Sequence, residues 1–290
     1  MREEMKEHTL RIIVNCGQAE LYIGKCISSI LSQSFRRWEA YVTVDPCGDR
    51  TFEQAVLTAG GDPRVHIRQN STRQYSMVNL IQAIKRSGAH REDIIVILDG
   101  DDWFSTEDAL PIIHDTYEEF GCWMTYGSWL SDQGDNQGRW PPYPEETTDF
   151  RHSEWLGTAV RTWKRWLWDL IDDRDFRDAG GEYFRVTEDR ASVLPMLEMS
   201  GTRKAKHISE VLMIYNRSSP YACCYTCRDD MLANAEYLQT RPPYKRLVEA
   251  AEAPKKELPA ANYGKRAPVR RRVKELNFES SGGDSGVTGY

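Results

Sequence analysis

Three aspartates within four positions, Asp99, Asp101 and Asp102, are the residues of this chain best suited to chemistry. They directly follow an apolar run at residues 94–98, which has the length and composition of a strand buried on both faces. Three like charges cannot be buried uncompensated, so we expect them at the strand's carboxyl end, where open α/β sheets bind ligands. Such closely spaced oxygens suit Mg²⁺ or Mn²⁺, which in turn would hold a diphosphate. The alternative, a helix cap, needs one aspartate rather than three.

A second acidic pair, Glu188 and Asp189, precedes an expected helix at residues 191–199. A carboxylate in a ligand site can accept a proton from a reacting hydroxyl group. Acidic residues are also common at helix N-termini, where they cap the helix and complement its dipole. The residues alone leave both roles open for this pair.

Several further polar residues also have two interpretations each. His207, near an expected strand, could bind a metal or be a satisfied structural histidine. Arg161 and Lys164 could contact an anion or lie on the solvated face of a helix. The Cys-Cys-Tyr-Thr-Cys stretch at residues 223–227 contains one CxxC pair, but a structural zinc site needs four ligands. We therefore interpret these cysteines as structural or incidental.

Apolar runs and helical spacing alternate along the first half of the chain, which predicts an α/β fold. Strands are expected at residues 10–15, 38–44, 65–68, 94–98 and 122–126, and helices at residues 20–32, 51–59, 77–84 and about 105–120. Alternating strands and helices favour right-handed crossovers and a mostly parallel sheet flanked by helices. The strand ends at Asn15, Asp45 and Asp99 should then meet at one rim.

The second half is less regular. Residues 127–151 are rich in Gly, Pro and aromatic residues and form either a lid or a surface loop. Trp129, Trp140 and Tyr143 could stack on a sugar or base, or could pin that loop. Residues 155–171 read as a Trp-rich helical stretch, and strands are expected at residues 205–208 and 211–215.

Composition narrows the class of protein. The 290 residues include 40% hydrophobic residues and no apolar run of the length that spans a membrane. The first residues lack the apolar segment of a signal peptide, and seven scattered cysteines suit reduced thiols, so a cytoplasmic location is expected. Net charge is −6, although residues 241–290 carry 11 Lys/Arg and 6 Asp/Glu. The acidic body argues against a broad nucleic-acid-binding face, whereas the basic tail at 266–274 is either a DNA-binding arm or an ordinary solvated tail.

Three stretches together resemble glycosyltransferase family 2 of the GT-A fold. They are KCISSILSQSFRRWEAYVTVD, DGDDW, and TEDRASVLPMLEMSG with the following VLMIYNRS. The resemblance covers residues 9–217 and implies a Rossmann-like GT-A domain at residues 1–228. Its nucleotide-binding half would span residues 9–126 and its acceptor side residues 127–228. Residues 229–290 would form a C-terminal extension, largely disordered from about residue 250.

The resemblance also implies roles for individual residues. The nucleotide-sugar donor would be bound by Asn15, Gly17, Asp45, Arg73, Asp99 and Asp101. The Mn²⁺ or Mg²⁺ ion would be bound by Asp101 and Asp102, with His207 as a further candidate ligand. Asp189 would be the general base, with Glu188 as the second candidate. Two donor loops depart from the family pattern: residues 15–18 read NCGQ, and residues 45–48 read DPCG.

The function implied is a metal-dependent, inverting transfer of a sugar from a nucleoside-diphosphate sugar to an acceptor hydroxyl. The acceptor stays open among glycans, lipid-linked sugars, proteins and a hydroxymethylated DNA base. A sugar-phosphate nucleotidyltransferase is disfavoured, because residues 15–20 contain one Gly and no Lys or Arg to grip a triphosphate. A degenerate, non-catalytic protein that binds a nucleotide sugar also stays possible on the sequence, and the oligomeric state stays open.

Overall fold

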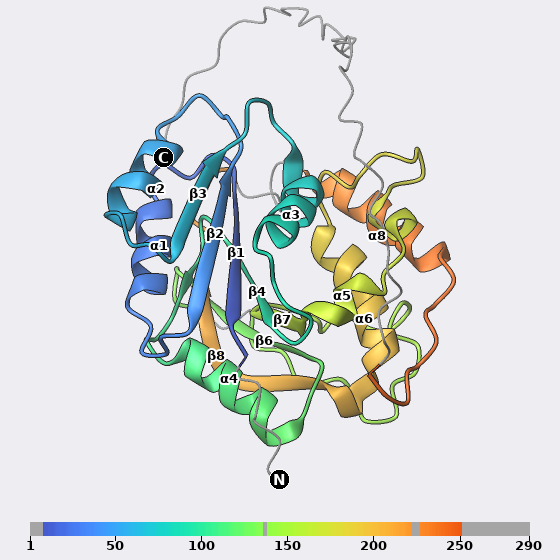
Figure 1. The fold of residues 1–290 in the computed structure, drawn as a ribbon. Coiled ribbons are helices and arrows are strands. Elements are labelled where there is room, and N and C mark those ends of the chain that lie inside the picture. The colour runs from blue at the N-terminus through green and yellow to red at the C-terminus, as the bar shows by residue number, and fades with distance from the viewer. Residues whose placement is uncertain (1–7, 136–137, 222–226, 251–290) are drawn as a thin grey trace, which may run out of the picture. The chain divides into compact units, whose positions relative to one another are not determined.

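One mixed sheet of eight strands organises the computed structural model, which describes residues 8–135, 138–221 and 227–250 (Figure 1). The strands are β1 (Leu10–Cys16), β2 (Trp38–Val44), β3 (Val65–Gln69), β4 (Ile94–Asp99), β5 (Trp103–Phe104), β6 (Met124–Ser131), β7 (Arg161–Lys164) and β8 (Ala205–Tyr215). Their order is β3-β2-β1-β4-β7-β6-β8-β5. These residues belong to the first of two units, Met1–Lys255; the second, Lys256–Tyr290, lies outside the described residues.

The first half of the sheet is parallel, as the alternating pattern predicted. Strand β1 pairs in parallel with β2 and β4, and β2 pairs in parallel with β3. Asn15 lies opposite both Thr43 and Asp99, so the carboxyl ends of β1, β2 and β4 meet at one edge. The prediction that Asn15, Asp45 and Asp99 share a rim is confirmed.

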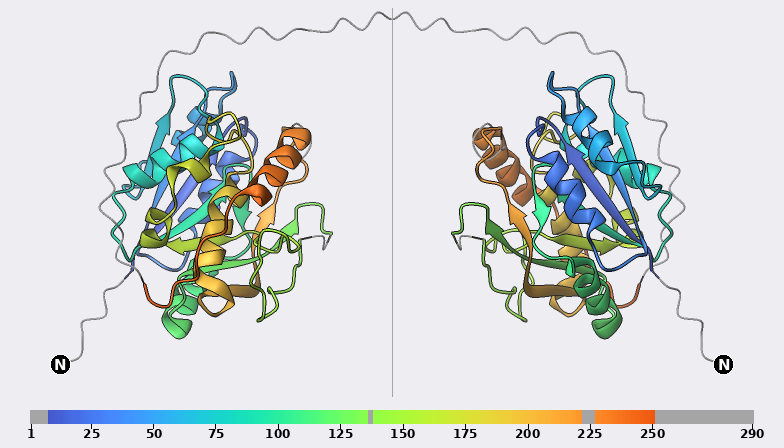
Figure 2. Two further views of the ribbon diagram at one scale, coloured as in Figure 1. Left: turned by 90° about the vertical axis from the view of Figure 1, so that its right-hand side faces the viewer. Right: turned by 90° about the vertical axis from the view of Figure 1, so that its left-hand side faces the viewer.

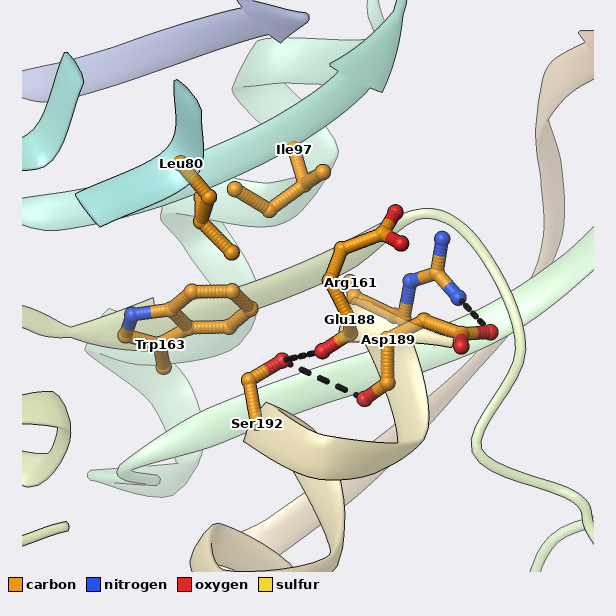
Figure 3. A pocket seen from close by; sticks show the side chains of 7 residues that line it. All are labelled: Leu80, Ile97, Arg161, Trp163, Glu188, Asp189 and Ser192. Carbon is orange, nitrogen blue, oxygen red and sulfur yellow. Dashed lines mark hydrogen bonds and ion pairs between the residues drawn. The ribbon is translucent and has the colours of Figure 1, made fainter. Parts of the chain in front are cut away.

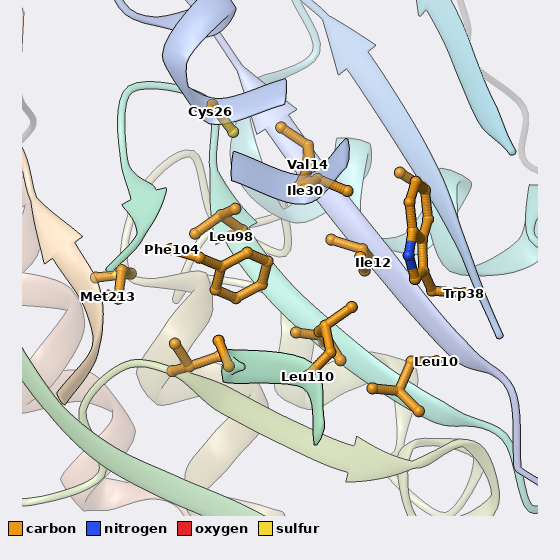
Figure 4. Packing of buried hydrophobic residues seen from close by; sticks show 14 of the residues in the cluster. Leu10, Ile12, Val14, Cys26, Ile30, Trp38, Leu98, Phe104, Leu110 and Met213 are labelled. Atoms are coloured by element: carbon orange, nitrogen blue, oxygen red, sulfur yellow. The ribbon is translucent and has the colours of Figure 1, made fainter. Parts of the chain in front are cut away.

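Helices cover both faces of this sheet, because alternate strand residues are apolar on both sides (Figure 2). One face packs on α1 (Ile23–Leu31), α2 (Thr51–Ala59) and α4 (Ala109–Phe120). The other packs on α3 (Tyr75–Arg86), α5 (Arg165–Asp169) and α6 (Glu188–Lys204). On the first face, Ile12 and Val14 lie near Ile30 and Leu110 (Figure 4). None of the helices in the described ranges has the length and apolarity needed to cross a bilayer.

The second half of the sheet corrects several boundaries. The expectation that residues 155–171 are helical holds only for α5 at residues 165–169, since the preceding residues form β7, which lies in the sheet antiparallel to β4 and β6. Strand β6 extends to Ser131, and the two expected late strands form one strand, β8, with register shifts opposite Ser128. Helix α6 begins at Glu188, and Gly201 interrupts it with a φ of 58°.

The chain after β8 returns to the body of the molecule. Helix α8 (Arg228–Thr240) buries Leu238 in the core on the α6 face. Beyond it, the N–H of Leu247 donates to the carbonyl of Met199 at 2.9 Å, and the hydroxyl of Tyr244 donates to Asp175 at 2.6 Å. Residues 251–290, with the basic stretch at 266–274, lie outside the described residues, as do four residues of the 223–227 cysteine stretch.

A buried ion pair fastens this return. Arg151 Nε and Nη2 donate to the Glu198 carboxylate at 2.6 and 3.0 Å, and Nη1 donates to the carbonyl of Leu238 at 2.7 Å. Both side chains are 3% exposed. We expect Glu198→Gln to lower the free energy of unfolding by about 3–5 kcal/mol, because the buried arginine loses its counter-charge.

Urea denaturation measures this loss, and Glu92→Gln is the matched control. Glu92 pairs with Lys164 at 3.0 Å, but its side chain is 35% exposed, so about 0–1 kcal/mol is expected. Equal losses in the two variants would contradict a structural role for the buried pair.

Candidate active site

The acidic segment after β4 forms a tight turn beside the end of β1. The N–H of Gly100 donates to the carbonyl of Asn15 at 2.9 Å, and the N–H of Asp102 donates to the carbonyl of Asp99 at 3.0 Å. A Cβ atom at position 100 would lie 2.5 Å from Cys16 Sγ, so the close approach of the two loops requires glycine. The turn therefore holds the aspartates at the edge where β1 and β4 end.

Asp102 also connects this turn to the far side of the sheet. Its Oδ1 accepts a hydrogen bond from the backbone N–H of Asn216 at 2.8 Å, and Asp102 is 2% exposed. Strand β5 follows directly and pairs Trp103 with Ile214 of β8. Asp102 is thus fixed where β4, β5 and β8 meet.

The three carboxylates lie in a poorly solvated place. Burial raises the pKa of Asp99 to about 6, and it raises the pKa of Asp101 and Asp102 as well, to well above the ordinary value for Asp102. The positive charge of Arg161 opposes this shift at Asp99 and Asp102. Carboxylates that carry a desolvation cost of this kind favour a cation as partner.

The donor set fits a hard divalent ion shared with a ligand. Within the described ranges, no three His, Cys, Asp or Glu side chains converge closely enough to hold an ion by themselves. Mg²⁺ is commonly bound by one or two carboxylates together with substrate phosphates. Asp101 and Asp102 could supply those carboxylates, and a diphosphate could supply the remaining oxygens.

A second cluster faces the same region from β7 and the start of α6 (Figure 3). Arg161 Nη1 donates to Asp189 Oδ2 at 2.8 Å, and the Arg161 side chain is 12% exposed. These residues line a small hollow whose walls are Leu80, Ile97, Arg161, Trp163, Glu188, Asp189 and Ser192. The charges of Asp189 and Glu188 both act on Arg161, as does that of Asp99, so the two acidic clusters share one arginine.

One end of the rim is built around Asp45. This residue is 3% exposed and accepts hydrogen bonds from Asn70 Nδ2 at 2.8 Å and from the backbone N–H groups of Gln74 and Tyr75 at 3.0 and 2.8 Å. Its carboxylate thereby fixes the turn that leads into α3. Next to it, Asn15 Nδ2 donates to the carbonyl of Ser76 at 3.4 Å.

Further predicted donor residues lie near this turn. Asn15 Oδ1 is buried without a partner in the part of the chain that is described, and so remains available to a ligand. Gly17 follows β1 and lies near Cys47: a Cβ at position 17 would be 3.9 Å from Cys47 Sγ. The guanidinium of Arg73 lies 4.7 Å from the Tyr75 ring centroid. The structure thus brings Asn15, Gly17, Asp45 and Arg73 to one end of the rim.

His207 does not lie with the acidic turn. It pairs with Tyr126 in the first part of β8, whereas Asp102 meets Asn216, just past the far end of that strand. Nine residues separate His207 from Asn216, and a strand advances about 3.3 Å per residue, far beyond a shared coordination sphere. The metal-ligand interpretation of His207 is therefore corrected, and its ring packs edge-on against Tyr126.

Tyr143, Trp129 and Lys164 each have a defined partner within the protein. Tyr143 is 4% exposed, and its hydroxyl accepts a hydrogen bond from the N–H of Leu156 at 3.0 Å, so it pins the loop from within the core. Trp129 packs against Tyr215 at 4.8 Å. Lys164 pairs with Glu92 at 3.0 Å, from a strand rather than from a solvated helix.

Comparison with known proteins decides the family. The model of the family described as glycosyl transferase family 2 matches residues 12–178, more than half of the chain. The chain belongs to glycosyl transferase family 2. The predicted family and GT-A fold class are therefore confirmed. No curated protein sequence matches it closely enough to add a relative.

Solved structures share the fold of this glycosyltransferase at low identity. Staphylococcus aureus TarS (residues 1–349) in complex with UDP-GlcNAc has a TM-score of 0.54 and 17% identity, covering 74% of this chain and 62% of that one. The Pyrobaculum calidifontis mannosyltransferase PcManGT, in complex with GDP-Man and Mn²⁺, has a TM-score of 0.53 and 14% identity; the match covers 79% of this chain and 64% of that one. Mycobacterium tuberculosis glucosyl-3-phosphoglycerate synthase, in complex with Mn²⁺, UDP-glucose and phosphoglyceric acid, has a TM-score of 0.55 and 12% identity; the match covers 81% of each chain. The chain spans about 60% of the TarS fragment of residues 1–349 and 37% of the longer TarS chain.

The sequence did not reveal two contacts of this site. Arg161 was expected either to contact an anion or to lie on the solvated face of a helix, whereas it lies on β7 and pairs with Asp189. Asn216, which is 1% exposed and holds Asp102 through its backbone N–H, carried no signal in its residue type. Both contacts depend on strands β7 and β8 returning to the sheet from far along the chain.

Protonation of Glu188 should affect the stability of the protein, which can be measured without any ligand. Burial raises its pKa from 4.5 to about 7, and the charges of Asp189 and Asp99 add to that shift. Because the folded state binds this proton more tightly than the unfolded state, its contribution to stability is complete below about pH 4.5 and is lost as pH rises through about 7. Between about pH 5 and pH 8, the free energy of unfolding should therefore fall by roughly 2 kcal/mol less in Glu188→Gln than in the wild type.

Urea denaturation of both proteins at those two pH values tests this. The conservative Glu182→Gln, at an exposed position on the same segment, should keep the wild-type pH profile. A wild-type profile in Glu188→Gln would show that Glu188 is solvated in the folded protein.

Proposed function

We propose that this glycosyltransferase moves a sugar from a nucleoside-diphosphate sugar to an acceptor hydroxyl, uses Mn²⁺ or Mg²⁺, and inverts the anomeric centre. The observation that carries the proposal is the meeting of two acidic clusters at the carboxyl edge of a parallel sheet, with Arg161 between them. The TarS and PcManGT structures, which contain nucleotide sugars, support the donor class. Since the chain spans about 60% of the TarS fragment of residues 1–349, the activity of the whole protein belongs to the proposal.

The donor nucleotide would lie at the end of the rim formed by Asn15, Gly17, Asp45 and Arg73. The unpartnered oxygen of Asn15 can accept a hydrogen bond from a base or ribose. Gly17 lets the backbone come close to the ligand, because it carries no Cβ. Asp45 sets the shape of this loop, since its carboxylate already accepts three donors. Arg73 supplies a positive charge for the diphosphate.

The metal would be held by Asp101 and Asp102, with Asp99 supporting the turn. A bound divalent cation neutralises the negative charge that develops on the diphosphate as the sugar–phosphate bond breaks. Asp102 offers one oxygen to the ion while the other keeps its hydrogen bond to Asn216. Asp101, the more accessible of the pair, can also reach a ribose hydroxyl.

Asp189 is the proposed proton acceptor. As the acceptor oxygen bonds to the anomeric carbon, the bond from that carbon to the diphosphate breaks, and Asp189 takes the hydroxyl proton. Attack from the face opposite the diphosphate in a single step inverts the anomeric centre. Arg161 holds the Asp189 carboxylate at 2.8 Å, which fixes its orientation. Glu188, the second candidate, lines the same hollow.

A screen of nucleotide sugars by thermal shift, with and without Mn²⁺, tests the proposal on the full chain. A donor that binds the folded state raises the melting temperature by mass action. We expect UDP- or GDP-sugars to stabilise the protein in an Mn²⁺-dependent way and to release the nucleoside diphosphate during turnover. No stabilisation by any nucleoside diphosphate, with or without Mn²⁺, would refute the donor and metal assignment.

A further inference from the structure

Two arginines are stacked on one aromatic ring at the mouth of the site. The guanidinium carbon of Arg73 lies 4.7 Å from the Tyr75 ring centroid, and that of Arg185 lies 4.9 Å from it. Both arginines are exposed, and neither has a carboxylate partner among the residues that the structure describes. Contact with a ring stabilises a guanidinium group, and two guanidinium groups close to one ring attract an anion to their surroundings.

The backbone holds this stack firmly. Tyr75 has a φ of 67° and Thr187 a φ of 73°, in the left-handed region that non-glycine residues rarely adopt. The two segments are joined, because the Ser76 hydroxyl donates to the carbonyl of Arg185 at 3.0 Å. Such a backbone conformation persists where the surroundings enforce it, which is common at ligand sites.

The stack lies between the nucleotide rim and the proposed base. Ser76 follows Tyr75 and accepts a hydrogen bond from Asn15 at the end of β1. On the other side, Arg185 comes three residues before Glu188 and four before Asp189. Arg185 therefore lies on the segment that leads from its contact with Ser76 to the acidic pair at the start of α6.

Charge makes this position informative about the acceptor. Besides the proposed metal ion and Arg73, which serve the donor, the site holds Asp99, Asp101, Asp102, Glu188 and Asp189 against Arg161. A neutral acceptor needs no further cation, whereas an acidic acceptor would be repelled unless its charge were met at the mouth. A guanidinium binds phosphate oxygens through two parallel N–H groups, which suits this task better than a lysine.

We propose that Arg185, stacked on Tyr75 beside Arg73, binds a phosphate group of the acceptor, and that the acceptor is therefore a phosphorylated hydroxyl compound. This inference rests on the proposed function, since it concerns the acceptor side of the same site. Arg185 is a binding residue for the acceptor, while Arg73 serves the donor diphosphate.

The test measures binding of glycerol 3-phosphate to the full-length protein saturated with Mg²⁺ and UDP or GDP. Isothermal calorimetry should show saturable binding to the wild type and none of glycerol, which lacks the phosphate. Arg185→Gln should weaken glycerol 3-phosphate binding by about 10–100-fold, since it removes charge-assisted hydrogen bonds. Arg185→Gln should leave the nucleotide affinity within about twofold of the wild-type value. The glycerol 3-phosphate affinity of Arg185→Lys should lie between those of the wild type and Arg185→Gln.

Arg174→Gln is the matched control, because Arg174 is 79% exposed and already paired with Asp172. It should bind glycerol 3-phosphate as the wild type does. Wild-type affinity in Arg185→Gln, or no saturable binding to the wild-type protein, would overturn the proposal. An equal loss of nucleotide affinity in Arg185→Gln would overturn it too, by assigning Arg185 to the donor. Failure of the proposed function is separate, because it would appear as absent nucleotide binding in the wild type.

Discussion

Asp102→Asn is expected to reduce sugar transfer by at least about 10²–10³-fold, the usual cost of losing a preorganised charge at a site of developing negative charge. Asparagine keeps the side-chain oxygen that accepts the N–H of Asn216 at 2.8 Å, so the junction of β4, β5 and β8 should survive. It removes the negative charge that would hold the divalent ion. Release of nucleoside diphosphate at saturating donor and Mn²⁺ measures the effect.

The defect in Asp102→Asn should come with a loss of metal dependence. The thermal shift produced by a nucleoside diphosphate should no longer increase when Mn²⁺ is added. Asp115→Asn, at a position whose side chain is 78% exposed, is the control and should behave as the wild type. Full, Mn²⁺-dependent turnover in Asp102→Asn would exclude Asp102 as a metal ligand.

Asp189→Asn is expected to lower the turnover number by about 10²–10⁴-fold, the typical contribution of a positioned general base. The donor should still bind, because the residues proposed to hold the nucleotide and the metal lie at the ends of β1, β2 and β4 and in the loop before α3, rather than on α6. The amide can still accept a hydrogen bond from Arg161, which keeps the hollow intact. Rates and Michaelis constants measured separately should therefore show a loss in the turnover number with little change for the donor.

Glu188→Gln provides the comparison that assigns the proton transfer. Glu188 lies next to Asp189 and lines the same hollow, but Arg161 donates to Asp189. We expect the Gln variant to lose less activity than Asp189→Asn. The reverse order, with Asp189→Asn active and Glu188→Gln inactive, would make Glu188 the base.

Much of the first half of the fold could be predicted from local sequence. The apolar runs that became β1, β2 and β4 are buried on both faces, and helical spacing between them demanded parallel crossovers. Parallel strands bring their carboxyl ends to one edge, so Asn15, Asp45 and Asp99 had to be neighbours once the strands were recognised. Three aspartates beside such a strand also indicated the chemistry, because burial of like charges needs a cation.

Contacts between distant segments could not be read in this way. Strand β7 has four residues, and its register is set by β4 and β6, so no local period distinguishes it from the Trp-rich helix that was expected. His207 shows the same limit: its residue type allowed a metal ligand, but its place along β8 removes it from the acidic turn. The Arg151–Glu198 ion pair, which fastens the chain after β8, could not be predicted from the sequence either.

By itself, the sequence determined the fold class and the acidic edge of the sheet, because these depend on residue type and on periods within single elements. The tertiary structure alone decided that Arg161 holds Asp189, that Asn216 holds Asp102, and that Arg73 and Arg185 share Tyr75. Each of these contacts joins elements far apart in the chain. Their geometry follows from how the strands pair and the helices pack, and no single stretch of sequence carries that information.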